Sequence, residues 1–267
     1  MKLTAPAIEP KVGTRRVELR CGSAVRTRVP NTLASMAIDT TFDFRTDANG
    51  KDPDWASPTL RDFHRRLWSK PLPDGRPFEL SASVRGSYLH HLSDIGEFSL
   101  SSDAVMATFL RWPERLQPIV QQFSTVDNEY LLRTTYTIGG MMVFPGNQID
   151  RRWTINQARG CNRSISDRFD LTVECIRRYY LGKWSPLQTT FDRYPEFFSL
   201  FRDFEGYVEF FLLDDIVGDD GQVRFFMPFD NFQSVAVPRD YSTYAEYRRR
   251  TIEFVHARNA RIARLDV

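Results

Sequence analysis

The chain has 267 residues and a mass of 31.1 kDa, the size of one large domain or two small ones. Hydrophobic residues make up 42% of it and charged residues 26%, a globular composition that excludes a disordered, collagen-like or coiled-coil protein. Lysine and arginine number 36 against 34 aspartates and glutamates, so the chain is not a general binder of polyanions. Local basic patches are compatible with this balance.

The N-terminal segment and the cysteines favour a cytoplasmic location. The first residues show neither an apolar segment nor a small-residue cleavage pattern, so we expect no secretory leader. Apolar runs such as FFLL and MMVF are far too short to span a membrane, so we expect no membrane association. The three cysteines, Cys21, Cys161 and Cys175, are odd in number and contain no CxxC pair, which favours a reducing compartment.

Two regions are expected. Residues 1–40 show no helical period and are predicted to form an N-terminal arm or edge strands. Residues 41–267 contain no repeat, low-complexity tract or Gly/Ser linker, which favours one continuous domain. Helical and strand patterns are interspersed along it, so we expect an α+β fold with a mixed or antiparallel sheet packed against several helices.

Helices are predicted where apolar residues recur at helical spacing behind a capping residue. The expected helices cover residues 58–68, 113–123, 167–180, 195–204 and 243–265. Residues 207–217 form either a helix or a buried strand, and we favour the helix. Runs of β-branched and aromatic residues predict strands over 78–92, 129–144, 153–155 and 223–229. Ser101, Ser102 and Asp103 are expected to cap a further helix that begins near Val105.

The predicted helix 167–180 carries a charged stripe opposite an apolar face. The apolar face is expected in the core and consists of Phe169, Val173 and Ile176. On the charged side, Asp170 and Glu174 act as a general base or as ligands of Mg²⁺ or Mn²⁺ in one interpretation. In the other interpretation, the stripe is a salt-bridge network in which Arg178 forms an ion pair with Glu174 one helical turn away.

Three polar residues, Asn156, Gln157 and Arg159, are expected where a strand end turns into that helix. Arginine can bind two oxygens of a phosphate or carboxylate at once, and a helix N-terminus attracts anions, so this segment is a candidate anion site. The alternative is that Arg159 pairs with Asp167 or Asp170 and fixes the loop.

His90 and His91 are adjacent on a predicted strand, so their side chains point to opposite faces and at most one faces a given cleft. Together with Asp94, Glu97 or Ser102, one of them can serve in general acid–base catalysis. The alternative is one exposed and one hydrogen-bonded histidine.

Phenylalanine is concentrated in one stretch, because 11 of the 21 lie between Phe191 and Phe232. This region is either core or an apolar surface covered by a protein partner.

Long blocks of the sequence resemble a known family. They are FDFRTDANGKDPDWASPTLRDFHRRLWSKPLPDG (42–75), YLHHLSDIGEFSLSSD (88–103), TIGGMMVFP (137–145), TINQARGCNRSISDRFDLTVECIRRYY (154–180), and GYVEFFLLDDIV to FFMPFD (206–230). They are similar to an uncharacterised bacterial, mainly actinobacterial, family of unknown function. The resemblance covers about residues 40–265. It implies a bacterial cytoplasmic domain and carries no activity, fold or cofactor.

The sequence leaves two functional hypotheses. The first is an enzyme acting on a phosphate-containing substrate, a nucleotide or nucleic acid, by phosphodiester hydrolysis or by nucleotidyl or ADP-ribosyl transfer. Its candidate residues are Asn156, Gln157, Arg159 and Arg178 for the anion, Asp170 and Glu174 as base or cation ligands, and His90 or His91 as acid. The second is a non-catalytic protein-binding module of a bacterial defence or toxin–antitoxin system, with 191–232 as the partner surface. Catalysis by this set of residues requires Arg159, Glu174 and one histidine to line a common cleft. The binding module instead predicts that these residues lie apart and that phenylalanines are exposed.

Overall fold

The computed structural model describes residues 37–107, 109 and 116–265. These fall in one compact unit, which spans 35–267, and the predicted arm over 1–40 lies almost wholly outside the described residues. The described unit combines helices with two small antiparallel sheets, which confirms an α+β fold. Within this part of the chain, no helix has both the length and the apolar character needed to cross a bilayer.

The helices are α1 (Pro53–Ala56), α2 (Pro58–Trp68), α3 (Gln117–Val120), α4 (Thr125–Thr135), α5 (Ile155–Cys161), α6 (Phe169–Tyr180), α7 (Gln188–Phe191), α8 (Pro195–Ser199), α9 (Phe204–Phe211) and α10 (Tyr241–Ile262). Two 3₁₀ helices are η1 (Phe44–Thr46) and η2 (Ile138–Gly140). The strands are β1 (Lys70–Pro71), β2 (Pro77–Phe78), β3 (Leu89–Ser93), β4 (Gly96–Ala104) and β5 (Met141–Pro145).

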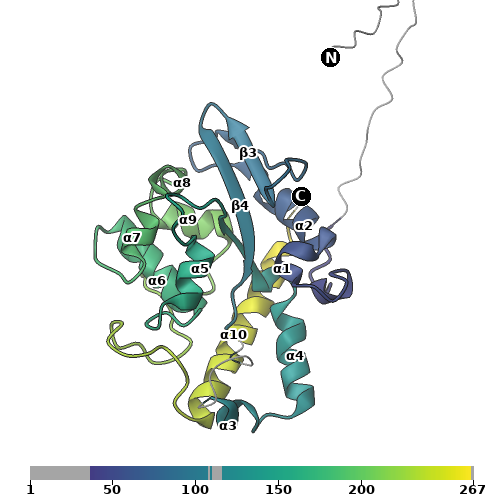
Figure 1. The fold of residues 1–267 in the computed structure, drawn as a ribbon, viewed down its shortest axis with the longest axis vertical. Helices are drawn as coiled ribbons and strands as arrows, with labels where there is room; N and C mark the ends of the chain where they lie inside the picture. Colours follow the sequence, from purple (N-terminus) through teal and green to yellow (C-terminus); the bar gives the residue numbers. More distant parts are fainter. Residues whose placement is uncertain (1–36, 108, 110–115, 266–267) are drawn as a thin grey trace, which may run out of the picture. The chain divides into compact units, whose positions relative to one another are not determined.

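Strand β4 is the central strand of the larger sheet, and its two neighbours pair with different halves of it. β3 pairs only with its first half, where Leu89 lies opposite Leu100, whereas β5 pairs with its second half up to Ala104. The edge of β4 beyond Leu100 is therefore not covered by β3, and α1 packs against β4. In Figure 1, α5, α6 and α7 lie on one side of β4, and α1 and α2 lie on the other.

The helices predicted at 58–68 and 167–180 are present, with one correction. Helix α2 has the expected bounds, and its first turn is capped by the Ser57 hydroxyl, which accepts the Leu60 N–H at 3.0 Å. The expected core face of α6 is confirmed, because Phe169, Val173 and Ile176 are buried. Helix α6 begins only at Phe169, however, because Ser166 and Asp167 adopt left-handed backbone conformations with φ of 50° and 62°.

Three strand predictions are wrong. The 129–144 segment begins inside α4, and only its end is a strand. The predicted strand 153–155 is instead the start of α5, and 223–229 forms only an isolated bridge between Val217 and Val223. In α4 and α5, capping boxes start helices at sites where side-chain composition favours strands.

The capping role predicted for Ser101, Ser102 and Asp103 is also wrong, because all three lie within β4. The helix predicted over 207–217 ends at Leu212, which takes a left-handed φ of 56°.

The phenylalanines between Phe191 and Phe232 belong to the core. Each of them is buried or half-buried, and they pack mostly edge to face, for example Phe197 on Phe201 with ring centroids 5.3 Å apart. This packing accounts for their concentration without a partner.

Candidate functional site

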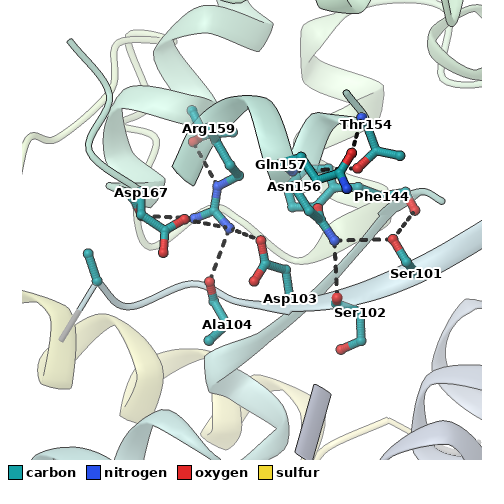
Figure 2. Close-up of polar contacts among 12 residues, drawn as sticks. Ser101, Ser102, Asp103, Ala104, Phe144, Thr154, Asn156, Gln157, Arg159 and Asp167 are labelled. Carbon is teal, nitrogen blue, oxygen red and sulfur yellow. Dashed lines mark hydrogen bonds and ion pairs between the residues drawn. The ribbon is translucent and has the colours of Figure 1, made fainter. Parts of the chain in front are cut away.

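Arg159 on α5 is the centre of a polar cluster (Figure 2). Its side chain is fully buried, and Nη1 lies 2.6 Å from Asp103 Oδ2 and 3.5 Å from Asp167 Oδ1. Nε donates to Thr172 Oγ1 at 3.2 Å, and Nη2 donates to the Asp167 carbonyl at 3.0 Å. The expected pairing with Asp167 is thus present, but the closest carboxylate comes from β4. These contacts engage the guanidinium of Arg159, so it holds the cluster together and has no pair of N–H donors free to bind a ligand.

Asp103 is the residue of this cluster that the sequence analysis missed. Ser99, Ser101 and Asp103 occupy alternate positions of β4 and are half-buried, so they share one face of the strand. Burial raises the pKa of Asp103 to about 7; Arg159 opposes this rise, and Asp167 adds to it. The carboxyl is 19% exposed. A carboxylic acid that titrates near neutral pH can both donate and accept a proton.

Asp54, on the one-turn helix α1, brings a further carboxyl group close to the cluster. Burial raises its pKa well above the usual value, and the carboxylates of Asp103, Asp52 and Asp167 raise it further. Its Oδ1 atom is buried and has no hydrogen-bond partner among the described residues. Burial likewise raises the pKa of Asp167, against the effect of Arg159. The cluster therefore has several carboxyl groups near one guanidinium, and their mutual repulsion favours the protonated form of some of them.

Asn156 joins α5 to β4 beside this cluster, as Figure 2 shows. Its Nδ2 donates to Ser101 Oγ and to the Ser102 carbonyl, both at 3.1 Å. Its Oδ1 is buried and lacks a partner among the described residues. Gln157 has a structural task, because its side chain accepts the Thr154 N–H at 3.0 Å in the capping box of α5.

The carboxylates of α6 contact other partners. Asp170 is fully buried, pairs with Arg168, and accepts the Phe226 N–H at 2.9 Å. Glu174 binds Arg177 at 2.8 Å and Arg178 at 2.7 Å. The salt-bridge interpretation therefore describes this stripe, and in the described part of the chain neither carboxylate is hydrogen-bonded to or paired with Arg159.

Both histidines of β3 are buried and hydrogen-bonded, so the expectation that one is exposed is wrong. His90 Nε2 lies 2.9 Å from Glu97 Oε1. His91 Nδ1 lies 2.8 Å from the Glu79 carbonyl, and its ring stacks on Phe78 with centroids 4.4 Å apart. The structure does not join Arg159, Glu174 and a histidine through any contact in the described residues.

A buried serine–histidine pair is also present, but its geometry does not make a nucleophile. Trp68 Nε1 donates to His64 Nδ1 at 3.0 Å, because an indole N–H can only donate. The neutral His64 ring must then carry its proton on Nε2, which lies 3.1 Å from Ser102 Oγ. Burial lowers the pKa of His64 to about 3, so the ring stays neutral and donates to Ser102 instead of deprotonating it.

A cavity of about 590 Å³ opens where β3 leaves the edge of β4. Ser99 and Ser101 line it from β4, and Trp55, Arg61 and Tyr88 line it from α1, α2 and the segment before β3. Further lining residues are Ala82, Ser83, Val84, Arg85, Gly86, Ser87, Leu100, Gly146 and Asn147. We call this cavity the β4 groove. Its size is that of a typical small-molecule site.

Two arginines give the β4 groove a positive charge. The guanidinium of Arg61 lies 4.8 Å from the Tyr88 ring centroid, and its Nε is buried without a partner among the described residues. Arg85 is exposed at a turn in which Gly86 has a φ of 87°. Neither arginine has a carboxylate within ion-pair distance in the described part of the chain, and no acidic residue lines the groove. Sequence analysis missed both, because Arg61 lies on a helix read only for its apolar face and the 82–88 segment around Arg85 carries no motif.

No group of three or more His, Cys, Asp and Glu side chains is arranged to hold a metal ion within the described ranges.

A model of a family of unknown function (DUF6994) matches residues 38–262, nearly the whole chain. No curated protein matches the chain, and no solved structure does. The chain belongs to this family of unknown function, as the sequence blocks led us to expect.

Proposed function

We propose that this family member is an enzyme that binds a phosphate-containing substrate in the β4 groove and uses Asp103 as its acid–base group. The observation that carries the proposal is the pair Arg61 and Arg85, two cations without carboxylate partners in a groove without acidic lining. A half-buried arginine such as Arg61 is costly without a counter-charge. Phosphate oxygens match the donors of Arg61 and of the exposed Arg85 well. The bacterial, cytoplasmic setting is part of the proposal, and the odd number of cysteines without a CxxC pair supports the reducing compartment.

Strand β4 leads from the groove to the proposed proton donor. Ser101 lines the groove, and Asp103 follows on the same face of β4, about 6.6 Å further along the strand. Asn156 and Arg159 fix these two side chains from α5. Asp103 does not itself line the groove, so a substrate whose phosphate is held by the two arginines near Ser101 has to extend along β4 to bring an ester oxygen to Asp103.

In hydrolysis of a phosphate ester, protonated Asp103 donates its proton to the leaving oxygen as the P–O bond breaks. Water forms the new P–O bond, and the proton that it loses returns the carboxyl group to its starting state. In nucleotidyl transfer an acceptor hydroxyl takes the place of water. A carboxyl group with a pKa near 7 suits both half-reactions, because its two protonation states are close in free energy at neutral pH.

The test is calorimetric titration with AMP, ADP and ATP, followed by an assay of their breakdown. Arg85→Ala removes an exposed side chain and should weaken binding by about tenfold or more through the lost charge-assisted hydrogen bonds. Arg264→Ala, an exposed arginine near the end of the chain, is the matched control and should bind as the wild type does. Asp103→Asn should retain binding and lose turnover. Equal affinities of the wild type and Arg85→Ala would refute the proposal.

A further inference from the structure

The β4 groove continues into a second cavity. This cavity, of about 230 Å³, shares the lining residues Trp55, Arg61 and Ala82 with the groove. The other lining residues, Ser57, Pro58, Asp62, Arg65 and Ala56, belong to α1, α2 and the residue between them. At this size it is smaller than ordinary self-contained ligand sites of roughly 300–1,000 Å³, so it fits an extension of the groove better than a separate site. We call it the α2 pocket.

The two cavities differ in charge. In the β4 groove, Arg61 and Arg85 have no acidic neighbour in the lining. In the α2 pocket, the additional arginine, Arg65, is paired with Asp62 at 2.7 Å. The groove therefore suits a phosphate-bearing group, whereas the α2 pocket suits an uncharged one. Arg61, common to both, lies where a phosphate that links the two groups would sit, and its Nε has no partner among the described residues.

Trp55 is the other residue at this junction. Trp55 is 63% exposed, and of the exposed tryptophans among the described residues it alone lines both the β4 groove and the α2 pocket. The indole therefore offers a bare aromatic surface between the cavities, and nucleobases stack on such surfaces whatever their identity.

We infer that the ligand is a dinucleotide unit, two nucleosides joined through phosphate, with the bridge at Arg61 and one base against Trp55 in the α2 pocket. This inference rests on the proposed function and adds the size of the substrate. A ligand of this kind could be part of a 3′,5′-linked nucleic-acid strand or a small dinucleotide with a 5′–5′ pyrophosphate.

The experiment compares AMP, the 3′,5′-linked dinucleotide pApA and 5′–5′-linked diadenosine diphosphate by calorimetry. The wild type should bind at least one dinucleotide about tenfold or more tightly than AMP, which is the stacking contribution of a single base. Whichever dinucleotide binds more tightly identifies the source. Trp55→Ala should weaken binding of the dinucleotide more than binding of AMP and so remove the advantage, and Trp55→Phe should keep most of it. Trp153→Ala, at another exposed tryptophan, is the control.

Equal affinities for AMP and both dinucleotides would overturn the inference while leaving the proposed function in place. So would an equal loss for AMP and dinucleotide in Trp55→Ala, because the indole would then belong to a single-nucleotide site. If the wild type binds none of the three ligands, both proposals fail.

Discussion

Replacing Asp103 by asparagine tests the electrostatics of the cluster. The folded protein raises the pKa of Asp103 from 3.8 to about 7, so it holds this proton more tightly than the unfolded chain does. The stabilisation is complete below about pH 4 and is lost as pH rises through 7. At about 1.36 kcal/mol per pKa unit the limit is about 4 kcal/mol, and partial solvent exposure reduces this to about 2–4 kcal/mol. Asparagine cannot titrate, so Asp103→Asn should gain that amount relative to the wild type between about pH 4 and 8.

The assay is urea unfolding of both proteins at several pH values across this range, with the transition monitored by circular dichroism. The difference between their unfolding free energies removes the pH dependence of all other groups. Asp215→Asn, at a carboxylate paired with Arg261 elsewhere, controls for the loss of one negative charge. If Asp103→Asn instead loses stability relative to the wild type as pH rises, Asp103 is an ordinary ion-pair partner of Arg159 and the reasoning is wrong.

Three further predictions concern stability and can be measured by denaturant titration. Phe169→Ala should cost about 3–5 kcal/mol because its ring is fully buried, and a loss below about 1 kcal/mol would contradict the packing of α6. Asp170→Asn should cost about 3–5 kcal/mol by leaving Arg168 buried without its counter-charge, whereas a neutral result would show that solvent reaches the pair. Thr154→Ala should cost about 1 kcal/mol through the lost cap of α5, and no change would mean that the cap is dispensable.

The fold could be predicted where local signals agree with packing. In α2, the Ser57 cap, Pro58 and the apolar spacing all indicate the same helix, and its bounds are as expected. In α5, the β-branched residues favoured a strand, but Thr154 and Gln157 satisfy each other's backbone amides and start a helix. The sequence contains this capping box, so the information was present and was outweighed by composition.

The site could be predicted only in part. Arg159 was identified because, with Asn156 and Gln157, it offers anion-binding donors beside a predicted helix N-terminus. Its position close to Asp167 follows from their short separation in sequence. Asp103 lies 56 residues before Arg159, and only the antiparallel pairing of β4 with β5, which precedes α5, brings them together. Arg61 and Arg85 likewise line the same groove only because the chain folds, and their spacing in the sequence does not indicate that they lie together.

The central claim is that the β4 groove holds the phosphate of a substrate. A crystal structure of Asp103→Asn soaked with ADP tests this most directly, because the variant should bind without turnover. The account predicts phosphate oxygens within hydrogen-bond distance of both Arg61 and Arg85, beside Ser101. A nucleotide bound elsewhere, such as in the cavity of about 330 Å³ lined by Phe229 and Phe232, with the β4 groove containing only solvent, would contradict it.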